Sequence, residues 1–209
     1  MFKKTLYPKT QRISHDSGIT ITEKLDGSNL GIFKMDDELW IATRKNIFAL
    51  SEIEDVKQVL YNGMYPWLKE NGETLLNNLH NDSGFFGEWI GMGKIKYPNL
   101  DKKIYMFAKA NITSDFEIIN LVYDHKNFIY PFDDQIPEFL GKVPIVVDGL
   151  TELPSIESLN NLYDYYCDIE KRNIEGFIII YNNKIKKYVR MKNGKLTEHE
   201  ESWTYIRKL

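Results

Sequence analysis

The feature that most constrains the fold is a series of short runs in which apolar and polar residues alternate. In residues 19–25 two isoleucines and a leucine fall on one face, and two threonines and a lysine fall on the other. Residues 26–28 form a turn signal, a second run begins at Leu30, and residues 36–37 lead into a third run, "ELWIAT". This pattern predicts a meander of short antiparallel strands.

A further strand pair is predicted near the end of the sequence. The runs "EGFIIIY" (175–181) and "KIKKYVRMK" (184–192) are separated by Asn182-Asn183, and asparagine tolerates the positive φ of a two-residue turn. Such a turn sets Glu175 opposite Arg190, and opposed side chains share a face. That face would also carry Lys186, Tyr188 and Lys192. Two interpretations stay open: a cross-strand ion pair, or a polar face directed toward a ligand.

The other predicted elements mix helices with strands. Residues 52–62, 67–79 and 154–171 have helical patterns, the last with Ser155 as its N-cap. Strands are expected at 84–90 and 103–109.

Length and composition exclude several classes of protein. The 209 residues suit one domain, and the single cysteine, Cys167, allows no internal disulfide, which fits a reducing cytoplasm. The net charge is -3, so binding to nucleic acid would need a local basic patch, for which residues 184–192 are the candidate. The alternative for this patch is an edge strand that its lysines protect from aggregation. No apolar run is long enough for a signal peptide or a membrane span.

Familiar nucleotide and metal motifs are missing from the sequence. No phosphate-binding P-loop is present, because Gly93-Lys94 is followed by Ile95, and no G-x-G-x-x-G occurs. The four histidines have no Cys or carboxylate at metal-ligand spacing. The remaining chemical signal is four polar clusters in strand-like runs: "EKLDGSN" (23–29), "ATRKNIF" (42–48), "FFGEWIGMGK" (85–94) and the hairpin at 175–192.

The order of these clusters resembles the covalent nucleotidyltransferases, which comprise DNA ligases, RNA ligases and mRNA capping enzymes. The matching elements are the K-x-D-G that begins at Lys24, Arg44, the "FGEW" around Glu88, the "EGFI" that begins at Glu175 and the "VRMK" that ends at Lys192. The chain looks most like RNA ligases of the RNA ligase 2 type, because Asn29 stands where DNA ligases usually have arginine. The stretch "GEWIGMGKIKYP" is also similar to their third motif.

The resemblance implies an α+β nucleotidyltransferase fold, with antiparallel sheets flanked by helices around an ATP cleft. It also implies that residues 1–209 form a single adenylation domain. The sequence ends soon after Lys192, so the separate C-terminal domain of most such ligases is expected to be missing.

The resemblance assigns roles to the central residues. Lys24 would be the nucleophile that forms a lysyl-AMP phosphoramidate. Glu88 would bind the ribose hydroxyls, since a carboxylate accepts two hydrogen bonds from a diol, and Arg44 would contact a phosphate. Glu175 would help to hold a divalent metal, and Asn29, with Arg44, would act at the RNA ends.

Charge neutralisation at the α-phosphate is assigned to Arg190 and Lys192. The family commonly has two lysines one residue apart in its last motif, and Arg190-Met191-Lys192 is the preferred match to it. Lys184-Ile185-Lys186 has the same spacing. An arginine suits charge neutralisation but rules out acid–base work at that position.

The assignments around the adenine are less specific. Phe107 would stack on the base, with Tyr105 on the same face as its substitute, and Glu23 would contact the adenine edge. A core aromatic and a solvated acid are the alternatives for Phe107 and Glu23. Asp26 and Gly27 either belong to the nucleotide site, where Gly27 admits a phosphate, or mainly form a turn.

The implied activity is ATP-dependent RNA sealing. AMP would pass from ATP to Lys24, then to an RNA 5′-phosphate, and a 3′-hydroxyl would displace it, with Mg²⁺ or Mn²⁺ as cofactor. A related DNA ligase, a GTP-using capping module and a non-catalytic nucleotide- or RNA-binding remnant are the alternatives. We expect a monomer in the cytoplasm that is encoded by a phage or virus or by its host, without a membrane partner. With that domain expected to be missing, an accessory RNA-binding protein is an expected partner.

Overall fold

The computed structural model describes residues 18–56, 63–91, 93–123, 131–133, 135–182, 184–192 and 195–196, and at residues 55–56, 191–192 and 195–196 it describes the backbone alone. The described chain divides into two compact units. The first comprises residues 27–91 and 102–142, and the second comprises residues 18–26, 93–101 and those from 143 onward. The single domain expected over residues 1–209 stays a prediction. None of the helices in the described ranges is long and apolar enough to cross a membrane.

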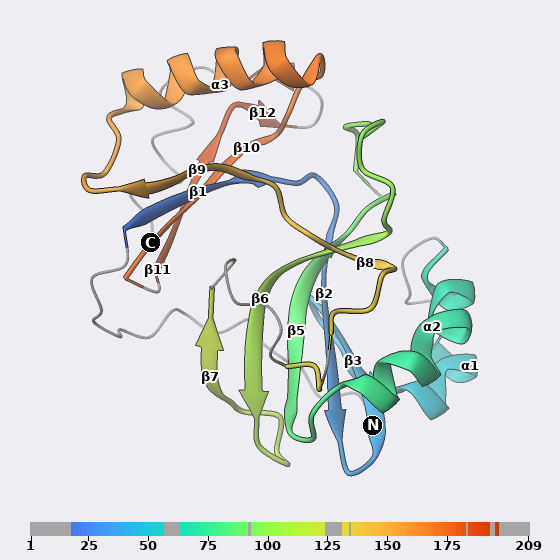
Figure 1. Ribbon diagram of the computed structural model, residues 1–209. Coiled ribbons are helices and arrows are strands. Elements are labelled where there is room, and N and C mark those ends of the chain that lie inside the picture. Colours follow the sequence, from blue (N-terminus) through green and yellow to red (C-terminus); the bar gives the residue numbers. More distant parts are fainter. Residues whose placement is uncertain are drawn as a thin grey trace. The chain divides into compact units, whose positions relative to one another are not determined.

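The first unit is built on a seven-stranded sheet (Figure 1). Its strands pair in the order β4-β3-β2-β5-β6-β7, all antiparallel, and the short β8 lies parallel to β6. The strands are β2 (Ser28–Met35), β3 (Glu38–Thr43), β4 (Ile47–Ala49), β5 (Ser83–Trp89), β6 (Ile104–Ile112), β7 (Ile118–Val122) and β8 (Leu140–Lys142). The helical elements are the 3₁₀ turn η1 (Leu50–Glu52), α1 (Ile53–Val56) and α2 (Met64–Asn78).

Helix α2 covers one face of this sheet. Its apolar stripe includes Trp67, Leu68 and Leu75, which pack with the strand residues Leu30 and Ile32 in one buried cluster. Because alternate strand residues point to opposite faces, the residues between these strand positions are directed to the other face.

The helix boundaries differ from those predicted. Helix α2 begins at Met64 rather than after Pro66, because a proline is tolerated in the first helical turn, where its missing N–H has no helical partner. The helix expected at 52–62 is observed as η1 followed by α1, which is described as far as Val56. Residues 57–62 lie outside the described chain.

The second unit has a four-stranded sheet in the order β11-β10-β1-β9, with helix α3 along one face (Figure 1). The elements are β1 (Ile19–Lys24), β9 (Ile145–Leu150), α3 (Ile156–Glu170), β10 (Gly176–Tyr181) and β11 (Lys184–Val189). The backbones of β12 (Met191–Lys192) and β13 (Lys195–Leu196) form a separate pair. Ser155 caps α3 as predicted, because its side-chain oxygen accepts a hydrogen bond from the N–H of Ser158 at 3.1 Å.

The predicted meander is only partly correct. Strands β2 and β3 form the expected hairpin, and Asp36 and Asp37 turn the chain with φ of 53° and 55°. Strand β1, however, pairs with β10 and β9 rather than with β2. The turn signal after Lys24 therefore carries the chain from one sheet to another and does not close a hairpin.

The register of the second hairpin is confirmed, but the face predicted to be polar is buried. Tyr181 pairs with Lys184 and Phe177 pairs with Tyr188, as a two-residue turn requires. Phe177 and Tyr188 stack with ring centroids 5.7 Å apart and pack under Tyr163 of α3. The three rings cover this face of the sheet, so its central part does not look toward a ligand.

This packing gives a stability prediction. The Phe177 side chain is fully buried, whereas Ile169 on α3 is 54% exposed. We expect Phe177→Ala to lower the free energy of unfolding by about 3–5 kcal/mol, because it leaves a cavity among the rings. Ile169→Ala should change it by less than about 0.5 kcal/mol. Urea denaturation followed by circular dichroism measures both, and equal effects would contradict the assigned core.

Candidate active site

Lys24 is the last residue of β1 and contacts a carboxylate brought from 151 positions along the chain, Glu175. The Lys24 Nζ lies 2.5 Å from the Glu175 Oε2, and the two side chains are 21% and 19% exposed. The pairing of β1 with β10 produces this contact, since it sets Lys24 opposite Gly176, the residue after Glu175. An amine and a carboxylate thus meet where solvent still reaches both.

Lys24 points away from the face that α3 covers. Ile21 and Glu23 are on the α3 side, so the strand period of two places Thr22 and Lys24 on the other side. The register extends this second face to Lys187, because Thr22 pairs with Ile178 and Ile178 pairs with Lys187. The sequence analysis missed Lys187. The strand period of two predicts that Lys187 and Arg190 point to different faces of the hairpin. That Lys187 shares a face with Lys24 follows only from the pairing of β1 with β10.

The surroundings of Glu175 raise the pKa of its carboxyl group. Burial raises the pKa of this carboxyl above its ordinary value, while the positive charge of Lys24 opposes the shift. The charge of Asp26 raises the pKa further, and that of Lys187 lowers it. A carboxylate of raised pKa in contact with an amine is suited to accept a proton from it.

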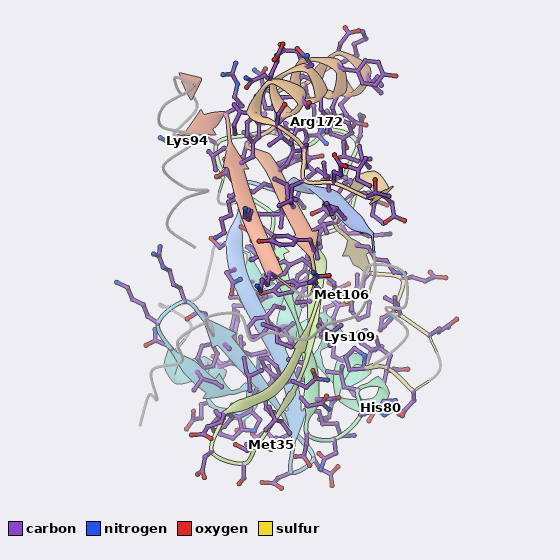
Figure 2. All side chains as sticks on the ribbon, turned by 90° about the vertical axis from the view of Figure 1, so that its left-hand side faces the viewer. Met35, His80, Lys94, Met106, Lys109 and Arg172 are labelled. Carbon is purple, nitrogen blue, oxygen red and sulfur yellow. The ribbon has the colours of Figure 1, made fainter. Side chains whose placement is uncertain are left out.

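Asp26 anchors a separate loop to the end of β1. Its Oδ2 accepts hydrogen bonds from the backbone N–H groups of Lys94 (labelled in Figure 2) and Ile95, at 2.6 Å and 3.0 Å. A Cβ atom on Gly93 would lie 1.9 Å from the backbone oxygen of Asp26, so only glycine permits this approach. Asp26 therefore does more than form a turn, because it fixes the loop that starts at Gly93.

Tyr97 holds the other side of Asp26. Its hydroxyl oxygen accepts a hydrogen bond from the Asp26 backbone N–H at 2.5 Å, and its side chain is buried. Burial raises the pKa of Tyr97 well above that of an exposed tyrosine, which keeps the hydroxyl neutral.

Glu23, directly before Lys24, is held in a buried ion pair. Its side chain is fully buried and both of its oxygens accept hydrogen bonds from Arg172, at 2.6 Å and 2.7 Å. The Tyr166 hydroxyl donates a further hydrogen bond to Glu23 at 3.2 Å. Arg172 and Tyr166 were not predicted from the sequence, because no motif contains them. Tyr97 lies in the stretch "GEWIGMGKIKYP", but no role was assigned to it. A contact between Glu23 and adenine stays a prediction, and the structure gives its carboxylate other partners.

Of the two basic residues in the last predicted motif, the side chain of Arg190 is described. The Arg190 backbone N–H donates to the Glu175 carbonyl oxygen at 2.9 Å, so the two residues are neighbours as predicted. The Arg190 guanidinium, however, lies 5.7 Å from the ring centroid of Tyr163 on α3. The side chain of Lys192 lies outside the described residues. Roles for Arg190 and Lys192 at a phosphate stay predictions.

In the first unit, Asn29 and Glu88 are directly opposed. The sheet register pairs Asn29 of β2 with Glu88 of β5, and Glu88 with Tyr105 of β6. Opposed residues share a face of the sheet. Leu30 and Met106 point to the other face and belong to the core under α2. Glu88, predicted to bind the ribose hydroxyls, and Asn29, predicted to act at the RNA ends, are therefore neighbours.

A β-bulge sets Phe107 apart from its neighbours on β6. Gly87 pairs with Met106 and Phe86 pairs with Ala108, which leaves Phe107 as the extra residue. Tyr105 is only 4% exposed, and its ring leaves no room for a Cβ on Gly141 of β8. The half-buried Phe107 is therefore better placed than Tyr105 to contact a base.

Arg44 and Gly27 have clear structural settings. Arg44 is exposed in the turn between β3 and β4, which is closed by a 2.8 Å hydrogen bond from the Thr43 N–H to the Asn46 oxygen. A Cβ on Gly27 would lie 2.4 Å from the Trp89 backbone oxygen, so glycine lets the start of β2 approach β5. Admission of a phosphate at Gly27 stays a prediction.

The predicted residues thus fall into two groups. Lys24 belongs to the second unit, together with Glu23, Asp26, Glu175 and Arg190, whereas the first unit contains Gly27, Asn29, Arg44, Glu88 and Phe107. That both groups contact one nucleotide stays a prediction. Among the described side chains, no group of three or more His, Cys, Asp or Glu residues could hold a metal ion.

Comparison with known proteins identifies a family. A family model described as RNA ligase matches residues 18–192. A Naegleria gruberi RNA ligase variant with ATP and Mn matches with a TM-score of 0.50 and 16% identity, over 90% of this chain and 56% of that one. A putative ATP-dependent DNA ligase from Aquifex aeolicus matches with a TM-score of 0.45 and 17% identity, over 88% and 49%. No curated protein matches the sequence significantly.

The chain therefore spans about half the length of these solved structures. At 16% identity, the Naegleria structure shows a shared fold. The α+β nucleotidyltransferase fold with largely antiparallel sheets is thereby confirmed.

The contacts of Asp26 give a second prediction. Asp26→Ala removes the oxygen that accepts both N–H groups, and hydrogen bonds to a charged group contribute about 1.5–3 kcal/mol. The backbone amides of residues 94 and 95 should therefore exchange with solvent about tenfold faster or more. Asp26→Asn is the matched control, since its amide oxygen can still accept both bonds and should retain part of the protection. Hydrogen exchange detected by NMR measures this, and unchanged exchange in Asp26→Ala would contradict the anchor.

The buried tyrosines give a prediction for alkaline pH. Burial raises the pKa of Tyr97, Tyr163, Tyr166 and Tyr188, whereas tyrosine in an unfolded chain ionises near pH 10, at about its ordinary pKa. The resulting stability is fully present below about pH 10 and is lost as the pH rises toward the folded-state values. Tyrosinate absorbance should therefore show a late step that coincides with the loss of circular dichroism. In Tyr188→Phe, stability should decline less steeply with pH.

Proposed function

Because the chain belongs to the RNA ligase family, we propose that it is an ATP-dependent RNA ligase that works through a covalent lysyl-AMP at Lys24. The observation that carries the proposal is the 2.5 Å contact between the Lys24 Nζ and the Glu175 Oε2. It joins the lysine of the K-x-D-G stretch to the glutamate of the "EGFI" stretch.

In the first step, the Lys24 amine attacks the α-phosphorus of ATP. A P–N bond forms and the bond from the α-phosphorus to the bridging oxygen of pyrophosphate breaks, so pyrophosphate leaves. A lysine must lose a proton before it can attack. The Glu175 carboxylate is in contact with the amine and is therefore placed to accept that proton.

The second and third steps transfer the AMP to RNA and seal the strand. An RNA 5′-phosphate oxygen attacks the phosphorus of lysyl-AMP, breaks the P–N bond and returns the amine of Lys24. The RNA 3′-hydroxyl then attacks the activated 5′-phosphate and releases AMP. Asn29 and Arg44 are proposed to contact the RNA ends.

A divalent cation fits the donor groups of this chain. Mg²⁺ is usually held by one or two carboxylates together with substrate phosphates and waters, so it does not need a cage of protein ligands. Glu175 is the proposed ligand, and the cation would neutralise the phosphate charge that grows during transfer. The Naegleria RNA ligase variant was solved with ATP and Mn, which supports the same pairing of nucleotide and metal here.

The first unit is proposed to bind the nucleoside. Glu88 would accept hydrogen bonds from the ribose hydroxyls, and Phe107 would stack on the adenine. Their support is the shared face of Glu88 and Asn29 and the half-buried position of Phe107 on its bulge.

Self-adenylylation tests the proposal directly. Incubation with α-labelled ATP and Mg²⁺ should transfer label to Lys24, and the bond should be acid-labile, as expected for a phosphoramidate, with the site located by mass spectrometry. Lys24→Met should abolish labelling, and Glu175→Gln should slow it by about 10²–10⁴-fold. Lys34→Met is the matched control, because Lys34 is also a partly buried strand lysine near a carboxylate, 3.9 Å from Asp37. Label that persists in Lys24→Met would contradict the proposal.

Substrate choice is tested by sealing assays with pre-labelled protein. A nicked RNA duplex and a single-stranded RNA with a 5′-phosphate are compared, with nicked DNA as the alternative and GTP in place of ATP as the nucleotide control. RNA joining with ATP supports the proposal. Joining of DNA alone, or labelling by GTP alone, supports one of the related transferases instead.

A further inference from the structure

Both sides of Lys24 are held by side chains from other parts of the second unit. Before it, the Glu23 carboxylate is bound by Arg172. After it, the Asp26 backbone N–H donates to the Tyr97 hydroxyl. The reactive amine therefore projects from a short segment that is fixed at two points.

A single guanidinium joins these two points. The central carbon of the Arg172 guanidinium lies 4.9 Å from the ring centroid of Tyr97, in a cation–π contact. Its two terminal nitrogens each bond one oxygen of Glu23, which is the bidentate arrangement that a planar guanidinium allows and an ammonium does not. Arg172 therefore contacts both the anchor before Lys24 and the anchor after it.

Arg172 is itself fixed close to the partner of Lys24. The backbone N–H of Arg172 (labelled in Figure 2) donates to the Cys167 backbone oxygen at the end of α3, at 3.3 Å. Arg172 lies three positions before Glu175. The short segment 172–175 thus begins with the residue that clamps Glu23 and ends with the carboxylate that contacts Lys24. Only two residues separate Arg172 from Glu175.

The buried pair is better suited to set geometry than to add stability. The Arg172 and Glu23 side chains are 5% and 0% exposed, so both lose hydration on folding. Among the residues that the structure describes, the Arg172 Nε has no hydrogen-bond partner, which adds a further cost. A pair with such costs contributes little net stability, whereas its bidentate geometry restricts orientation closely.

We propose that Arg172 is a positioning residue for the nucleophile, which aligns Lys24 by clamping Glu23 and stacking on Tyr97. This inference rests on the proposed function of Lys24. Arg172 is not proposed to contact the substrate. Its substitution should therefore change the rate of lysyl-AMP formation rather than the binding of ATP. A misplacement of about 1 Å at a reacting group can cost about 10²-fold in rate.

The test uses Arg172→Lys, which keeps the charge but removes the bidentate bond. We expect kcat for lysyl-AMP formation to fall by about 10²-fold while KM for ATP stays within about twofold. The control is Lys171→Gln, because Lys171 makes an exposed ion pair with Asp168 and should leave both constants unchanged. Thermal unfolding of each variant confirms that the folded enzyme is compared. A folded Arg172→Lys enzyme with wild-type kcat would overturn the proposal.

A second variant covers the case in which Arg172→Lys does not fold. In Glu23→Gln/Arg172→Gln no charge is buried without a partner, so the chain should fold, and its kcat should be lowered to a similar extent. Methylguanidine should restore part of the activity of Arg172→Ala, and methylamine should not. Wild-type kcat in the double variant, or equal rescue by the two amines, would overturn the proposal.

An ATP-independent readout separates this inference from the proposed function. Acetic anhydride acetylates accessible lysines, and mass spectrometry gives the rate at Lys24. We expect faster acetylation of Lys24 in Arg172→Lys and an unchanged rate at Lys34. If the wild-type protein forms no lysyl-AMP, the proposed function fails but this measurement still tests the positioning. An unchanged Lys24 rate overturns the positioning alone.

Discussion

The antiparallel pairing of β1 with β10 brings Lys24 into contact with Glu175. Its register sets Lys24 against Gly176 and buries Glu23 against Phe177 on the opposite face. Because the side chains alternate, a slip of one residue would direct Lys24 into the packing under α3 and expose Glu23. The amine is therefore accessible only as long as the aromatic core of the second unit keeps this register.

The sequence predicted the local elements better than their partners. The β2–β3 hairpin, the capped helix α3 and the β10–β11 register follow from turn residues, the Ser155 cap and periodicity, all of which act over a few positions. The pairing of β1 with β10 joins segments more than 150 positions apart, and nothing local encodes it. The meander was extended wrongly to β1 because Asp26-Gly27 is a turn signal whether or not the two strands pair.

The site was predictable where a motif exists, and otherwise it was not. Lys24 and Glu175 were found from short stretches of sequence, and the structure places them in contact. Arg172 and Lys187 were missed, because a lone arginine after a helix and one lysine among several in a basic strand have no distinguishing spacing. Tyr97 lies in the stretch that resembles the third motif, but its contact with Asp26 is not encoded there. Their importance depends on burial and on which face each strand presents, and both are set by the tertiary structure.

The division of the second unit into three chain segments has a consequence for biosynthesis. Strands β2, β3 and β4 follow one another closely, so these hairpins of the first unit can form soon after translation of their residues. Strand β1 is made before them, but its partners β9 and β10 are made after all strands of the first unit. The ribosome therefore releases β1 as an edge without a neighbour and must add more than a hundred residues before Lys24 acquires its surroundings. Until then, this edge is open to pairing with other nascent chains.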